Sequence, residues 1–130
     1  MKKSIMFTLA IIVAGFITGC SSVPTHCNTT GIWKYKFEEN GRSGVQEGTM
    51  TIAQESYVLK GKCNDAFGEF NITGAMSENS PKFIIDGIRN DDKRSFRLNA
   101  SLCSDNEFEG TYTTNQNTSG TMTGKRIDAQ

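Results

Sequence analysis

The segment Gly31-Ile32-Trp33-Lys34-Tyr35-Lys36-Phe37 decides the fold class that we predict for this chain. Its bulky apolar and polar residues alternate, which is the period-2 pattern of a β-strand with one buried face. Trp33, Tyr35 and Phe37 would lie on the buried face, with the two lysines in solvent. Trp33 is the only tryptophan, and we expect a core to close around so large a side chain.

More alternating segments follow at a spacing of about ten residues, each bounded by Gly, Asn, Asp or Ser. We predict strands at about residues 30–38, 45–53, 57–62, 67–76, 82–88 and 94–103, with two more around residues 108–112 and 121–123. Short strands joined by tight turns predict an all-β fold, an eight-stranded antiparallel up-and-down barrel without open edges. A two-sheet β-sandwich is the alternative.

The alternation also predicts which side chains fill the barrel. The inward positions are Met50, Ile52, Tyr57, Leu59, Phe70, Ile72, Phe83, Ile85, Phe96, Leu98, Ala100 and Leu102. Together with the aromatic residues of the first strand, Phe108 and Tyr112, these side chains would fill most of a narrow interior. We interpret the aromatic residues as core, with the lining of a ligand pocket as the alternative. Glycines recurring along the strands, such as Gly48, Gly61 and Gly74, suit bulges or sharp corners.

The amino terminus has the features of a secretory signal. Met1-Lys2-Lys3 is positively charged, and residues 5–17 form an apolar run in which Thr8 is the one polar member. Thirteen residues are too few to span a bilayer comfortably, and small residues follow. We therefore predict a signal peptide over residues 1–19.

The run ends in Ile17-Thr18-Gly19-Cys20, which resembles the lipobox of bacterial lipoproteins. The resemblance implies that Cys20 becomes the lipidated amino terminus, carrying diacylglycerol and an amide-linked acyl chain such as palmitate, and that Ser21 after it favours the outer membrane. A plain signal peptide with an incidental cysteine is the alternative. We expect residues 20–30 to be the anchor and a flexible tether, residues 31–127 the barrel and residues 128–130 a tail.

The body of the chain resembles the lipocalin-like (calycin) barrels. The matching residues are Gly31-x-Trp33 at the start of the first strand and Arg126 after the last. The resemblance implies that Trp33 closes the barrel floor and that a late basic residue, Lys125 or Arg126, stacks on it. The body is shorter than a lipocalin, so we do not expect a roomy cavity.

Three cysteines remain beside Cys20, and an oxidising periplasm favours one pair. In an up-and-down barrel Cys27 and Cys103 lie at one end and Cys63 at the other, so we predict a Cys27–Cys103 disulfide. In a sandwich, Cys63–Cys103 becomes an alternative. His26 is the only histidine, and its spacing to the cysteines fits no zinc pattern, so we predict no metal site.

The charges give little indication of a partner. The chain carries 14 basic against 14 acidic residues, and loss of residues 1–19, with Lys2 and Lys3, leaves 12 against 14, or −2. This balance argues against a nucleic-acid partner. Five cations would lie toward one end of the barrel and could form a docking rim for an acidic partner: Lys60, Lys62, Arg89, Lys93 and Arg94. Ordinary solvated turn charges are the alternative interpretation.

The sequence contains no arrangement typical of catalysis. No Ser/His/Asp set is present in the barrel, because His26 precedes it, and no glycine-rich phosphate loop opens a helix. We therefore predict a non-enzymatic lipoprotein without a cofactor, anchored on the periplasmic face of the outer membrane. Its expected role is a binding module that docks a protein partner through its loops, an inhibitor being one form of it. The alternatives are a carrier of a small apolar ligand and a structural envelope protein.

Overall fold

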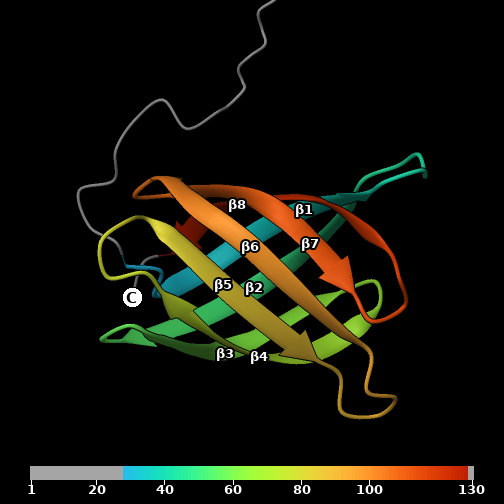
Figure 1. The fold of residues 1–130 in the computed structure, drawn as a ribbon, viewed down its shortest axis with the longest axis horizontal. Helices are drawn as coiled ribbons and strands as arrows, with labels where there is room; N and C mark the ends of the chain where they lie inside the picture. The colour runs from blue at the N-terminus through green and yellow to red at the C-terminus, as the bar shows by residue number, and fades with distance from the viewer. Residues whose placement is uncertain (1–27, 129–130) are drawn as a thin grey trace, which may run out of the picture.

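The computed structural model describes residues 28–128, and every regular element in that range is a β-strand. The strands are β1 (Gly31–Glu39), β2 (Gln46–Glu55), β3 (Val58–Asp65), β4 (Gly68–Met76), β5 (Lys82–Ile88), β6 (Ser95–Ser104), β7 (Glu107–Thr114) and β8 (Ser119–Asp128). They form one closed barrel in sequence order (Figure 1). All eight pairs are antiparallel, including β1 with β8. The predicted all-β, up-and-down barrel is confirmed, and the sandwich alternative is wrong.

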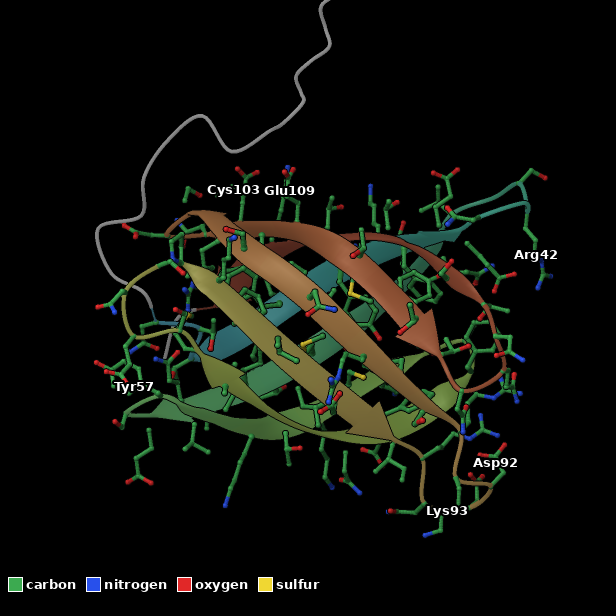
Figure 2. The ribbon with its side chains drawn as sticks, in the orientation of Figure 1. Arg42, Tyr57, Asp92, Lys93, Cys103 and Glu109 are labelled. Carbon is green, nitrogen blue, oxygen red and sulfur yellow. The ribbon has the colours of Figure 1, made fainter. Side chains whose placement is uncertain are left out.

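The meander gives the barrel two distinct ends. We call the end where β1 begins and β8 ends the floor; it also holds the turns at residues 56–57, 77–81 and 105–106. The mouth is the opposite end, with the turns at residues 40–45, 66–67, 89–94 and 115–118. Figure 2 shows Tyr57 and Cys103 toward the floor, whereas Arg42, Asp92 and Lys93 lie at the mouth.

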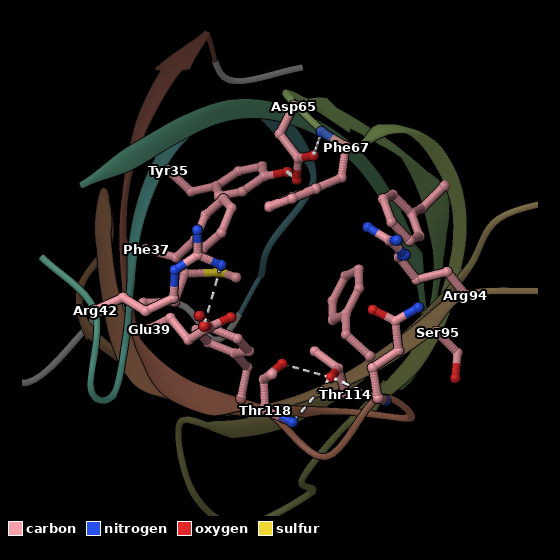
Figure 3. Close-up of a pocket in the computed structure, with 15 residues that line it drawn as sticks. Tyr35, Phe37, Glu39, Arg42, Asp65, Phe67, Arg94, Ser95, Thr114 and Thr118 are labelled. Atoms are coloured by element: carbon pink, nitrogen blue, oxygen red, sulfur yellow. Dashed lines mark hydrogen bonds and ion pairs between the residues drawn. The ribbon is translucent and has the colours of Figure 1, made fainter. Parts of the chain in front are cut away.

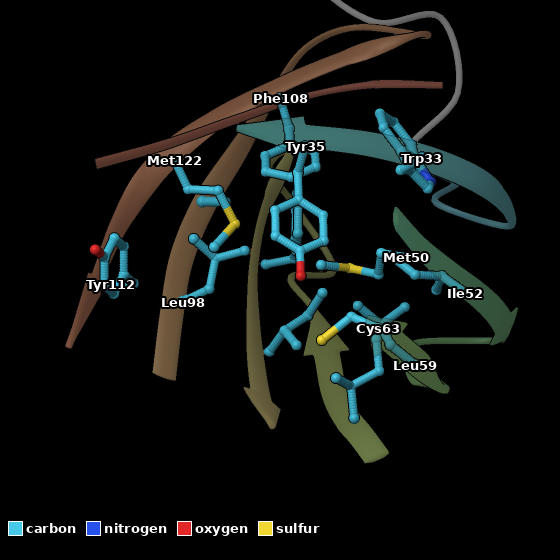
Figure 4. Packing of buried hydrophobic residues seen from close by; sticks show 14 of the residues in the cluster. Trp33, Tyr35, Met50, Ile52, Leu59, Cys63, Leu98, Phe108, Tyr112 and Met122 are labelled. Carbon is cyan, nitrogen blue, oxygen red and sulfur yellow. The ribbon is translucent and has the colours of Figure 1, made fainter. Parts of the chain in front are cut away.

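The interior is a single apolar cluster running from floor to mouth (Figure 4). Trp33, Met50, Leu59 and Leu98 are fully buried, as the alternating pattern predicts. One inward assignment is wrong, because Tyr57 is 46% exposed. It lies in the β2–β3 turn, where the positive φ of Ser56, 59°, takes the chain out of strand geometry before β3 begins at Val58.

Gly61 and Gly74 lie at close approaches between strand backbones rather than at bulges. Gly61 pairs with Ile52 in unbroken register, but a Cβ on it would lie 1.8 Å from the Thr51 carbonyl oxygen. Only a residue without a side chain lets the two backbones approach so closely in a tightly coiled barrel. The register shifts instead between Ile32 and Trp33 and between Leu102 and Ser104.

Some of the predictions concern segments that the structure does not describe. The signal peptide over residues 1–19, lipidation of Cys20 and the tether through Cys27 lie outside the described residues, as do residues 129–130. Within residues 28–128 there is no helix long and apolar enough to cross a membrane.

Candidate functional site

The floor of the barrel is closed by Trp33 and Arg126. The Arg126 guanidinium carbon lies 4.5 Å from the Trp33 ring centroid, within the range of a cation–π contact. This is the placement that the lipocalin resemblance implies for the two residues. The Trp33 indole Nε1 donates to the Thr29 carbonyl oxygen at 2.8 Å. The tryptophan side chain is therefore fully buried with its one polar atom satisfied.

Arg126 ties three parts of the chain together at the floor. Its Nη2 donates to the carbonyl oxygens of Asn28 at 2.6 Å and Asp105 at 2.7 Å, and its Nη1 donates to that of Thr30. Burial lowers the pKa of Arg126, and the charge of Asp105 opposes that shift. These bonds join the segment before β1 to the β6–β7 turn across the floor.

The cysteines occupy different ends of the structure. Cys103 lies at the floor, where the register of β6 shifts, two residues before Asp105. The carbonyl oxygens of Asp105 and Asn28 both accept from Arg126 Nη2. Cys27, the neighbour of Asn28, is outside the described residues, so the Cys27–Cys103 disulfide stays a prediction. Cys63 is a free thiol buried inside the barrel. The alternative pairing of Cys63 with Cys103 is therefore not formed.

A cavity of about 260 Å³ opens at the mouth (Figure 3). The residues around it come from the mouth ends of β1, β3, β4, β6, β7 and β8 and from the turns between strands. They are Tyr35, Phe37, Glu39, Arg42, Asp65, Phe67, Phe70, Arg94, Ser95, Phe96, Tyr112, Thr114, Gln116, Thr118 and Met122. Six of these fifteen residues are aromatic, and their rings contact one another: Phe37 packs edge-on against Tyr112 at 5.7 Å, and Phe70 against Phe96 at 5.5 Å.

The inner part of the cavity holds a phenol and a carboxylate. The Tyr35 hydroxyl donates to Asp65 Oδ2 at 2.7 Å, and the Phe67 amide donates to the other carboxylate oxygen at 2.8 Å. Burial raises the pKa of Tyr35 far above its usual value, and the neighbouring Cys63 and Asp65 add to the shift. Tyr35 is therefore a neutral donor whose hydrogen bond is already used.

The outer part of the cavity has a different polar lining. Arg42 forms an ion pair with Glu39 at 3.5 Å, and the hydroxyls of Thr114 and Thr118 share a 2.6 Å hydrogen bond. Two buried polar atoms, Arg94 Nε and the Tyr112 hydroxyl, have no hydrogen-bond partner in the described part of the chain. The mouth therefore combines an apolar wall with two unused hydrogen-bond donors.

The five cations of the predicted rim lie in three settings. Lys60 and Lys62 are exposed on the outer wall of β3, because that strand continues to Asp65 instead of ending at residue 62. Arg89 donates to Asp91 at 2.9 Å and Asp92 at 2.6 Å, so its charge is compensated. Lys93 is exposed in the same turn, whereas Arg94 lies against the Phe67 ring in the cavity wall.

Sequence reasoning missed most of the mouth cavity. Arg42, Asp65 and Phe67 are absent from the site residues that the sequence predicts. Tyr112 lies in the core, as predicted, and lines the cavity as well. The signal that could have found them is the clustering of aromatic and charged residues at the strand ends of one pole. No group of three or more His, Cys, Asp or Glu side chains within residues 28–128 could hold a metal ion.

No family model matches this chain, and no curated protein matches it. Among solved structures the chain is similar to a redesigned β-barrel, b11L5F_LGL, with 16% identity and a TM-score of 0.63, covering 75% of this chain and 90% of that one. It is also similar to the redesigned barrel mFAP1 bound to DFHBI (13% identity, TM-score 0.59, 75% and 94% covered). A third is a de novo designed fluorescence-activating β-barrel (14% identity, TM-score 0.58, 81% and 99% covered). These likenesses establish the fold alone.

Proposed function

We propose that this chain is a non-enzymatic binding protein that holds a small ligand in its mouth cavity. The observation that carries the proposal is the contrast along the barrel axis. The floor and middle are filled by buried side chains, whereas the mouth keeps an aromatic-walled space with two unpartnered donors. A concave, mostly apolar site with a few polar groups is typical of small-molecule recognition.

The size of the cavity restricts the ligand. Pockets that bury drug-sized molecules are about 300–1,000 Å³, so a cavity of about 260 Å³ suits a smaller molecule. The similar barrel mFAP1 is bound to DFHBI, which supports the idea that a barrel of this fold can take a ligand. This role corresponds to the carrier expected as an alternative from the sequence, with a more polar ligand than that hypothesis assumed.

The test compares two Thr→Phe substitutions on opposite sides of the barrel wall. Thr118 lines the cavity and Thr111 is exposed on the outer face of β7. In native mass spectrometry of the chain purified from its own host, we expect a small-molecule adduct on the wild type and on Thr111→Phe. Thr118→Phe should lose it, because the added ring occupies the mouth. An adduct that persists in Thr118→Phe, or a bare wild type, would contradict the proposal.

We also propose that the chain is a lipoprotein of the bacterial cell envelope, anchored through Cys20 on the periplasmic face of the outer membrane. The lipobox-like Ile17-Thr18-Gly19-Cys20 supports this. The first described residue, Asn28, is held at the floor through Arg126, so the mouth would point away from the membrane.

Cys20→Ser is expected to move the chain from the membrane fraction to the soluble fraction and to abolish labelling by radioactive palmitate. Two or more acyl chains give stable anchoring, and the variant has none. Cys27→Ser is the control and should stay membrane-bound and labelled. Membrane retention of Cys20→Ser, or an unlabelled wild type, would refute the anchor.

Docking of a protein partner through the mouth loops is the second candidate function. The β1–β2 hairpin extends beyond the barrel with Arg42 near its tip (Figure 2). Two apolar side chains at this end are solvent-exposed, Val45 by 55% and Phe67 by 38%. A co-purifying protein that Thr118→Phe retains would favour docking over ligand binding in the native mass spectrometry experiment.

A further inference from the structure

Two donors in the mouth cavity have no acceptor. Arg94 Nε and the Tyr112 hydroxyl are buried and unpartnered among residues 28–128, and Tyr112 is only 5% exposed. Buried donors are normally satisfied, and each exception calls for a missing partner. Both residues line the same cavity, so one bound molecule in this space could accept from both.

The other polar groups of the cavity are already engaged. The two Asp65 oxygens accept from the Tyr35 hydroxyl and the Phe67 amide, and Glu39 pairs with Arg42. Neither carboxylate accepts from Arg94, and Asp65, held by two neutral donors, keeps its negative charge in the inner part of the cavity. Figure 3 shows Arg94 across the opening from the Arg42–Glu39 pair.

Arg94 forms no ion pair with any described residue, and the carboxylates of Asp91 and Asp92 in the same turn pair with Arg89. The charge of Arg94 still acts on Asp92, whose pKa it helps to lower. The position of Arg94 is fixed from two directions: its amide donates to Asp92 Oδ1 at 3.1 Å, and its guanidinium carbon lies 5.4 Å from the Phe67 ring centroid. A guanidinium held in this way is suited to a carboxylate, whose paired oxygens match its planar fork.

Aromatic rings form the apolar part of the cavity wall. Phe37 contacts both Phe67 and Tyr112, at 6.1 Å and 5.7 Å. Phe96 is partly buried against the core and lies edge-on to Phe70. Aromatic faces and edges of this kind favour a flat apolar body through offset or edge-to-face contacts.

We propose that the ligand of the mouth cavity is a small aromatic carboxylic acid, whose carboxylate accepts from Arg94 and Tyr112 and whose ring packs among Phe37, Phe67 and Phe96. The inference rests on the proposed function, since it assigns a chemical class to the ligand of that site. A neutral apolar ligand of the same size would leave Arg94 Nε and the Tyr112 hydroxyl unsatisfied.

The test uses a matched pair of probes, cinnamate and cinnamamide, which differ in charge but hardly in shape. Isothermal titration calorimetry on the full chain is expected to show that cinnamate binds about tenfold more tightly, the range of a hydrogen bond to a charged group. Arg94→Gln should remove this preference while cinnamamide still binds, which also shows that the variant is folded. Tyr112→Phe should weaken cinnamate alone, and Lys60→Gln, which removes a cation from the outer wall, should change neither probe.

The outcomes separate the inference from the proposed function. Equal binding of the two probes by the wild type, or an acid preference that survives Arg94→Gln, would overturn the assignment of an acidic ligand and leave a small-molecule site in place. Failure of both probes to bind the wild type would overturn the inference and count against the small-ligand function itself. Loss of the acid preference in Lys60→Gln would show that long-range charge, and not Arg94, selects the probe.

Discussion

Trp33→Ala is expected to lower the free energy of unfolding by about 3–5 kcal/mol, the usual cost of removing a large buried aromatic side chain. Trp33 is fully buried and lies between the Arg126 guanidinium and the Phe108 ring, whose centroid is 5.3 Å away. Alanine would leave a cavity at the floor and deprive Arg126 of its ring contact. Urea denaturation followed by circular dichroism measures the loss.

Tyr57→Ala is the matched control for the floor experiment. Tyr57 is also a large aromatic residue near the floor, but it is 46% exposed. Its replacement should change the free energy of unfolding by no more than about 0.5 kcal/mol, as for other surface positions. Comparable losses in the two variants, or a change below about 1 kcal/mol for Trp33→Ala, would mean that the floor does not hold the barrel together.

The second large effect is a loss of stability at alkaline pH. Burial raises the pKa of the Cys63 thiol from 9.0 to about 12, and the nearby Tyr35 hydroxyl opposes the shift in part. A pKa that is higher in the folded state gives stability that is complete below the unfolded value and is lost as the pH rises toward the folded value. For Cys63 this window runs from about pH 9 to about pH 12. At pH 10.5 the loss should be about 2 kcal/mol, at about 1.4 kcal/mol per pH unit.

Cys63→Ser separates this contribution from general alkaline effects. Serine has no proton to lose in this range, so the fall in melting temperature between pH 8 and pH 10.5 should be smaller in the variant. Burial also raises the pKa of Tyr35, so its contribution to the free energy of unfolding falls in the same way above pH 10. Tyr35→Phe removes this second contribution to the pH dependence. Identical pH slopes for the wild type and Cys63→Ser would show that the thiol is ionised without cost.

The strands could be predicted because two independent local signals agree in this sequence. Alternation marks each strand, and Gly, Asn, Asp or Pro marks its ends; β5, between Pro81 and the turn at residues 89–94, occupies the predicted residues 82–88. The contact between Trp33 and Arg126 was anticipated from the family resemblance, because no local pattern relates residues so distant in sequence. Tyr57 shows where prediction from alternation fails: the positive φ at Ser56 places this side chain outside the barrel, although the alternating pattern predicts that it points inward.

The mouth cavity could not be predicted in the same way. Alternation tells on which face of a strand a side chain lies, but not at what height along the barrel it stands. Lys60 and Lys62 illustrate this. The sequence predicts that the strand ends at residue 62, three residues before the observed end of β3 at Asp65, and so places two lysines of the outer wall at the rim. The grouping of Arg94 with Phe67 and Tyr112 depends on how β3, β6 and β7 are staggered, which only the pairing register determines.

The closure of β1 on β8 also determines when the molecule can fold. Thr30 and Arg126, which share a hydrogen bond, are separated by 96 positions, so the last contact of the barrel has nearly the greatest loop-closure entropy available to this domain. Each hairpin can form early from local contacts, but Trp33 is not covered until the final strand has been made. A chain lacking β8 would present two unpaired strand edges and an open hydrophobic interior. Synthesis, and any transport in the unfolded state, must therefore be complete before the native barrel exists.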